Sequence, residues 1–134
     1  MPGVIIPILD KRVFEFSFLG NAATQDVVLH PAVDIISYLK VKVLVRVHSI
    51  TATTGNFQFR LFNTFPSEQD PQEFTDSTAV GSATSITTAS PNIVVANSTT
   101  DAQAFLKIVL RATQGTSGNT LYGEFSAALL LREN

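Results

Sequence analysis

The chain has 134 residues, a formal net charge of −2, no cysteine and only 15% charged residues. Its length and its 45% apolar residues are typical of one globular domain with a buried core, here residues 1–134. The lack of clustered Lys and Arg argues against a nucleic-acid partner, and the lack of cysteine excludes a disulfide framework and a thiolate zinc site.

The first ten residues form an apolar arm whose side chains include Val4, Ile5, Ile6, Ile8 and Leu9. No basic residue precedes this arm, so it is not predicted to be a secretion signal. No apolar run approaches the ~18–20 residues needed to cross a membrane, so we expect a cytoplasmic protein without a membrane partner. The arm is expected to be the first strand of the domain or to reach across to a neighbouring subunit. The two possibilities are compatible if the arm forms a strand that adds to the edge of a partner's sheet.

The next two segments alternate in polarity. Val13–Leu19 places three Phe side chains on one face and is predicted to be a strand, followed by a turn at Gly20-Asn21. Gln25–His30 is predicted to be a short strand that ends at Pro31, because proline has no N–H for a sheet ladder. No helix longer than a turn or two is expected, and that only near residues 31–37.

The clearest strand is Leu39–His48, whose apolar face consists of Leu39, Val41, Val43, Val45 and Val47. A helix would scatter these residues around its axis, and β-branched residues favour strands. The other face carries Lys40, Lys42, Leu44, Arg46 and His48. A leucine among positive charges suits contact better than chemistry, so Lys40, Lys42, Leu44 and Arg46 join the arm residues as predicted interface residues.

The remaining segments complete an all-β pattern. Phe57–Phe65 alternates again, and its first half is predicted to form an antiparallel hairpin with Val41–Val47. The polar segment Pro66–Asp76 is predicted to be a loop. Further strands are expected at Thr78–Thr88, Ile93–Ala96, Ala104–Thr113 and Leu121–Arg132. About eight antiparallel strands in this length predict a two-sheet sandwich, and a jelly roll in particular.

The last strand has one unusual stretch. Leu121, Phe125, Ala127, Leu129 and Leu131 share one face of it, yet residues 127–131 read Ala-Ala-Leu-Leu-Leu without alternation. Such a run is expected where a strand is covered on both faces. In a sandwich the outer face would otherwise contact water, so this run indicates an oligomer interface.

No motif for catalysis or metal binding is present. His30 and His48 are in no G-x-S-x-G or H-E-x-x-H pattern, so both are expected to be structural or surface residues. The acidic residues Glu68, Asp70, Glu73 and Asp76 lack the glycine and terminal glutamate of a calcium loop, so we expect a solvated acidic loop. We therefore expect no enzymatic activity, no cofactor and no metal.

Six of the nine basic residues fall on predicted strands: Lys40, Lys42, Arg46, Arg60, Lys107 and Arg111. One interpretation is a single basic sheet face that docks against an acidic neighbour. The other is that these are ordinary outward strand positions that discourage edge pairing.

In its compact length, Ser- and Thr-rich strands, apolar arm and lack of Cys, the whole chain resembles the small jelly-roll decoration or auxiliary proteins of tailed-phage virions. The resemblance rests on these general features of the whole chain and on no specific motif, so it assigns no functional residue. It implies a structural role as a homo-oligomer, with a trimer favoured, located in the virion. Such an oligomer would stabilise a shell of major capsid protein by bridging its subunits through buried apolar area.

The alternative is a carbohydrate- or ligand-binding sandwich, with polar loops such as Asn56, Pro66–Asp76 and Gln114–Asn119 forming the site. That function requires an exposed aromatic platform, for which Tyr38 and Tyr122 are the only non-Phe candidates, because Trp is absent. A hydrolase on a sandwich scaffold would instead require a histidine or an acid pair that meets in a pocket.

Overall fold

The computed structural model describes residues 3–18, 24–51, 54–66, 74–102, 104–115 and 120–133. Within these ranges every regular element is a β-strand, and there are eight. The strands are β1 (Gly3–Ser17), β2 (Thr24–Asp34), β3 (Lys40–Thr51), β4 (Asn56–Pro66), β5 (Phe74–Val80), β6 (Ile93–Thr99), β7 (Phe105–Thr113) and β8 (Thr120–Arg132).

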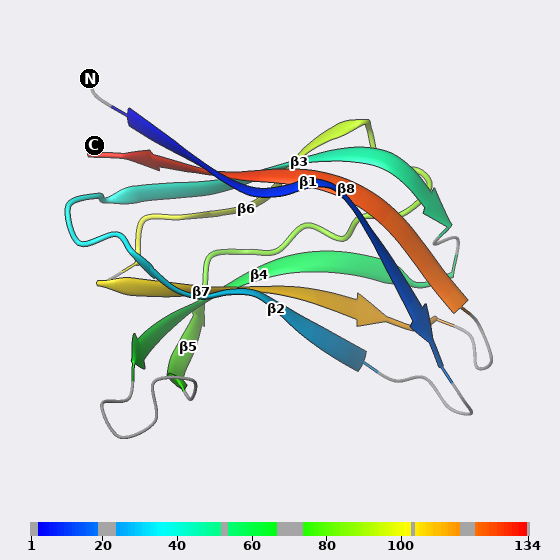
Figure 1. Ribbon diagram of the computed structural model, residues 1–134, viewed down its shortest axis with the longest axis horizontal. Coiled ribbons are helices and arrows are strands. Elements are labelled where there is room, and N and C mark those ends of the chain that lie inside the picture. The colour runs from blue at the N-terminus through cyan, green and yellow to red at the C-terminus, as the bar shows by residue number, and fades with distance from the viewer. Residues whose placement is uncertain are drawn as a thin grey trace.

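The strands form two stacked four-stranded sheets (Figure 1). Sheet A has the order β1-β8-β3-β6 and sheet B the order β2-β7-β4-β5, and every pairing is antiparallel. The first and last strands pair along their length, so the two ends of the chain lie together. This strand order is that of a jelly roll, and it confirms the predicted eight-stranded sandwich.

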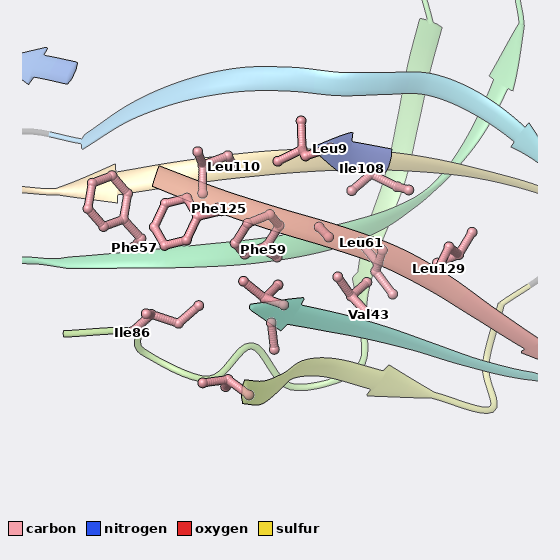
Figure 2. Close-up of a cluster of buried hydrophobic side chains, with 14 of the residues drawn as sticks. Leu9, Val43, Phe57, Phe59, Leu61, Ile86, Ile108, Leu110, Phe125 and Leu129 are labelled. Atoms are coloured by element: carbon pink, nitrogen blue, oxygen red, sulfur yellow. The ribbon is translucent and has the colours of Figure 1, made fainter. Parts of the chain in front are cut away.

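The core lies between the sheets and consists of the inward side chains of both (Figure 2). Phe57 and Phe59 of sheet B meet Phe125 of sheet A edge-on, with ring centroids 5.2 and 5.7 Å apart. Such edge contacts add to the apolar area that these rings bury. Gly123 leaves room for this packing, because a Cβ there would lie 2.5 Å from the Phe125 ring.

Several predicted strand faces are confirmed. Phe14, Phe16 and Phe18 are all buried, as are the inward residues of β8 that the sequence places on one face. In β3, Val41, Val43 and Val45 have no exposed surface, and Val47 is half-buried. Leu39 does not belong to this core face: it precedes β3 and is 61% exposed.

The predicted hairpin between residues 41–47 and 57–61 is wrong. β3 pairs with β8 and β6 in sheet A, whereas β4 pairs with β7 and β5 in sheet B. Consecutive strands β3 and β4 therefore belong to different sheets. Both segments alternate because each covers the same core from opposite sides, and alternation alone does not tell this arrangement from a hairpin.

Two predicted boundaries also differ from the structure. β2 continues past Pro31 to Asp34. It is an edge strand of sheet B, and its register with β7 shifts between His30 and Val33. An edge strand with a bulge tolerates a proline, since the missing N–H need not have a partner. The predicted loop Pro66–Asp76 overlaps the end of β4 and the start of β5, and its residues 67–73 lie outside the described residues, as does the predicted turn at Gly20-Asn21.

The predicted strand Thr78–Thr88 ends early, at Val80. The chain that follows contributes one isolated bridge, in which the Ile86 N–H donates to the Phe57 carbonyl at 2.8 Å and the Ile86 carbonyl accepts from the Phe57 N–H at 3.0 Å. Ile86 is fully buried. The apolar residues of this segment therefore mark a single core contact rather than a strand.

We expect Phe59→Ala to lower the free energy of unfolding by about 3–5 kcal/mol, because it leaves a cavity among the fully buried rings. Phe62→Ala in the same strand is the control, since Phe62 is only half-buried on the outer side of sheet B. Urea denaturation measures both values. Equal losses for the two variants would contradict the assignment of the core.

Candidate functional site

The middle of the outer face of sheet A, the side turned away from the core, is mainly apolar, and all four strands contribute to it. β8 lies between β1 and β3, and its outward residues Ala128 and Leu130 are only half-buried. The register sets Pro7 and Leu44 on either side of Ala128. On the edge strand β6, Ile93 and Val95 are 60% and 46% exposed.

A groove of about 480 Å³ runs over the middle of this face. It is lined mainly by the apolar residues Pro7, Leu9, Leu44, Ile93, Ala127 and Ala128, and its polar lining consists of Asp10, Arg46 and Ser126. Contributions from all four strands of sheet A meet here, so the site depends on the complete jelly roll rather than on one segment.

A smaller hollow of about 290 Å³ lies at the end of the face where β3 begins and β8 ends. It is lined by Lys40, Lys42, Leu130 and Arg132. All three cations are exposed. This end of the face is therefore positively charged, although the whole chain has a net charge of −2.

The predicted interface residues fall into two groups. Ile5, Lys40, Lys42, Leu44 and Arg46 are on the outer face or at its end, because the register pairs each with an outward residue of β8. Ile6, Ile8 and Leu9 pack against the core, and Val4 pairs with the inward Leu131 while remaining 37% exposed. The apolar arm is thus the first half of β1, hydrogen-bonded to β8 of its own chain.

The sequence did not single out Pro7, Ile93, Val95, Ala128 and Leu130 as individual interface residues. The run without alternation at residues 127–131 was the signal for the last two, since alternate residues of a strand point to opposite faces. Ile93 and Val95 carried the same signal, as they flank the buried Val94.

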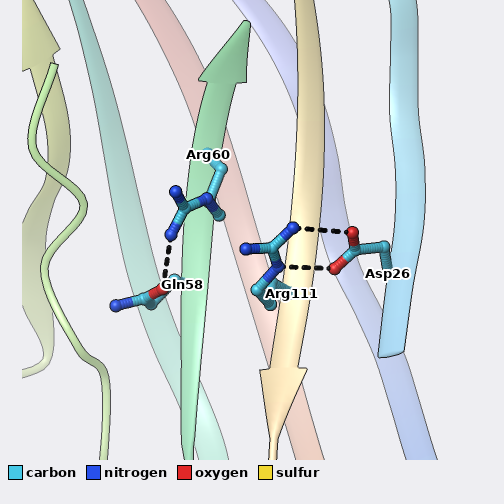
Figure 3. Close-up of polar contacts among 4 residues, drawn as sticks. All are labelled: Asp26, Gln58, Arg60 and Arg111. Atoms are coloured by element: carbon cyan, nitrogen blue, oxygen red, sulfur yellow. Dashed lines mark hydrogen bonds and ion pairs between the residues drawn. The ribbon is translucent and has the colours of Figure 1, made fainter. Parts of the chain in front are cut away.

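The basic strand residues do not form one patch. Lys40, Lys42 and Arg46 are on sheet A, and the other three are on the outer side of sheet B. On sheet B, the Arg111 Nε and Nη2 groups donate to both carboxylate oxygens of Asp26, at 2.8 and 3.0 Å (Figure 3). This hydrogen bonding raises the pKa of Arg111. On the neighbouring strand β4, Arg60 Nη1 donates a hydrogen bond to Gln58 Oε1 at 3.1 Å.

His48 is the histidine that the structure brings near the groove. It sits at a register shift in β3, and its Nε2 lies 2.8 Å from Ser126 Oγ. The backbone N–H of Lys11 donates to the same Oγ at 3.0 Å, from a bulge of β1 where Lys11 has a φ of 49°. This strained conformation and the two bulges aim both groups at Ser126. In the part of the chain that the structure describes, no carboxylate hydrogen-bonds to His48.

The other candidate residues are dispersed. His30 is exposed on β2, and Glu68, Asp70 and Glu73 lie outside the described residues. Within the described ranges, no three His, Asp or Glu side chains gather as a metal site would require. The same ranges hold no helix of the length and hydropathy that crossing a membrane takes.

Tyr38 and Tyr122 lie at opposite ends of sheet A. Tyr38 precedes β3 and packs against the core, whereas Tyr122 pairs with Thr51 at the far end of that strand. The intervening strand β3 has 12 residues and is therefore ~41 Å long at about 3.4 Å per residue. The two rings therefore do not form a shared platform.

The fold is similar to that of protein structures from infectious bursal disease virus. The structure of the Gx strain, the crystal structure of the VP2 subviral particle and the structure of the Gt strain match with TM-scores of 0.59, 0.58 and 0.56 at 16, 16 and 14% identity. These matches cover 97, 97 and 98% of this chain but only 31, 32 and 32% of those chains. The chain thus spans about a third of the proteins it matches. No protein-family model and no curated protein matches it.

We expect Ser126→Ala to lower the free energy of unfolding by about 1 kcal/mol, because Lys11 N–H and His48 both lose a hydrogen-bond partner. Ser49→Ala, an exposed serine on the adjacent strand, is the control and should have a smaller effect. Chemical denaturation of both variants measures this difference. Equal stabilities would show that the Ser126 contacts do not hold the two bulges.

Proposed function

We propose that this chain is a non-enzymatic structural protein that assembles with copies of itself as part of a virion shell. The observation that carries the proposal is the apolar groove of about 480 Å³ across the outer face of sheet A. A contiguous apolar surface on a small domain is a common mark of a protein–protein contact. Fully burying one side chain such as Ile93 or Leu44 contributes roughly 1.5–3 kcal/mol.

The fold supports a shell component. Jelly rolls are frequent in viral capsid domains, and one of the similar structures is a VP2 subviral particle. VP2 is about three times as long as this chain, so its own assembly cannot be transferred contact by contact. What supports the proposal is the shared fold together with the apolar outer face.

In its finer form, the proposal is a homo-oligomer, with a trimer favoured, that decorates a phage capsid and bridges neighbouring copies of a major capsid protein. The chain would be made in the cytoplasm and become part of the virion. Its action would be non-covalent, through apolar area buried at the outer face and steering by the charges around it.

The second candidate is a carbohydrate-binding module, because jelly rolls also occur in lectins. This function requires an exposed aromatic platform, and Tyr38 and Tyr122 do not form one because they lie at opposite ends of sheet A. A glycan array tests this candidate, and specific binding of one glycan class would favour it over assembly.

We expect Val95→Asp to shift the chain toward the monomer, because it places a charge on the apolar face. Val28→Asp is a matched control: Val28 is 47% exposed and Val95 46%, and each lies on an edge strand, of sheet B and sheet A respectively. Analytical ultracentrifugation of the 14.5 kDa chain over a range of concentrations measures the effect.

We predict that the wild-type chain and Val28→Asp sediment as the same oligomer, whereas Val95→Asp dissociates at least tenfold more readily. A wild-type chain that is monomeric at every concentration and does not bind capsids would contradict the proposed function. So would equal association of the two variants.

A further inference from the structure

The charged side chains on the outer face of sheet A are separated along the strands. Lys40, Lys42 and Arg132 gather at one end. At the other end the outward residues include Glu124 of β8 and Glu15 of β1, which lie within three positions of one another in the register. The apolar groove lies between the two ends. The groove therefore lies between a cluster of cations at one end and two glutamates at the other, while Lys11 and Arg12 are exposed at the bulge of β1 beside the groove.

A second copy can cover this face through a two-fold axis, and the axis of such a face-to-face contact lies in the plane between the two sheets. Within that plane, two directions are distinct: along the strands or across them. If the axis runs along the strands, each end lies over the same end of its partner, and the lysines of both copies meet. If the axis runs across the strands, the positive end of each copy lies over the negative end of the other. Only the second arrangement sets opposite charges together, and it does so twice.

We propose that two copies of this chain pack through the outer faces of sheet A about a two-fold axis across the strands, near Ala128 and Ser126 of β8. This inference rests on the proposed function and names the partner and its orientation. In this arrangement the row of Pro7, Ala128 and Leu44 lies over the row of the partner that contains Ser126, so each groove is closed by the other copy.

The available area fits a stable pair. The strands of sheet A have 15, 13, 12 and 7 residues. At ~3.4 Å per residue and about 4.8 Å between strands, they cover a face of roughly 750 Å² on each copy. That area is close to the ~800 Å² per partner of a standard interface. The groove's charged residues, Asp10 and Arg46, have opposite signs, so neither groove brings a net charge into the contact.

A two-fold contact through one face also sets the number of copies. It pairs chains, so an oligomer that uses it contains an even number of them. A trimer formed through other edges of the sandwich would pair face to face into a hexamer.

Charge exchange between the two ends tests the orientation. Lys42 is exposed and Glu124 half-buried on the outer side, so Lys42→Glu and Glu124→Lys should leave the fold intact, which thermal melting followed by circular dichroism checks. Each single variant places like charges together twice in its own pair, and we expect its dissociation constant to rise about tenfold or more. An equimolar mixture of the two variants restores opposite charges at both ends of the mixed pair.

We expect the mixture, and the double variant Lys42→Glu/Glu124→Lys, to associate within about threefold of the wild type. Fluorescence-labelled chains in a sedimentation velocity experiment distinguish mixed pairs from pairs of one variant. High salt should weaken the wild type and the mixture alike, because the end contacts are exposed.

Other outcomes separate this inference from the proposed function. If neither single variant associates more weakly than the wild type while their mixture associates more tightly than the wild type, like ends lie together, the axis runs along the strands and the inference is wrong. If Val95→Asp weakens association while neither charge variant does, self-assembly stands but this pairing is overturned. A strictly trimeric wild-type chain would also overturn the pairing and leave the proposed function in place.

Discussion

Strand β8 carries the constraint on which both the fold and the proposed interface depend. It lies between β1 and β3 in sheet A, and its inward residues are buried against the rings of sheet B. Because alternate residues of a strand point to opposite faces, the same strand determines what sheet A presents outward. Near its C-terminal end those outward residues are Ala128 and Leu130, so a strand required for the core also makes the outer face apolar.

The topology turns this local feature into a surface. β1 and β3 come from distant parts of the chain, yet their registers with β8 bring Pro7 and Leu44 to the two sides of Ala128. The edge strand β6 then extends the apolar face with Ile93 and Val95. Bulges in β1 and β3 direct the Lys11 N–H and His48 to Ser126 of β8, so Ser126 links β1, β8 and β3 beside the groove.

The sequence was sufficient to predict the fold class, because alternation in segments such as Val13–Leu19 and Leu39–His48 reflects burial of one face. It was not sufficient to predict the pairing of β3 with β8, since alternation is the same for strands of either sheet. For the site, Leu44 and the run at residues 127–131 were visible in the sequence. Their meeting with Pro7 and Ile93 depends on long-range register. Of the arm residues predicted as contacts, Ile6 and Ile8 pack against the core, whereas Leu9 is buried and also lines the groove.

The central claim is that copies of this chain cover the outer face of sheet A and leave that of sheet B open. Residue-level carbene labelling at low and high protein concentration tests it most directly, with mass spectrometry reading out Ile93, Val95 and Val28. The account predicts that labelling of Ile93 and Val95 falls as concentration rises, while Val28, which is as exposed as Val95, stays labelled. Unchanged labelling of Ile93 and Val95 in an associated sample, or protection of Val28 in their place, would contradict it.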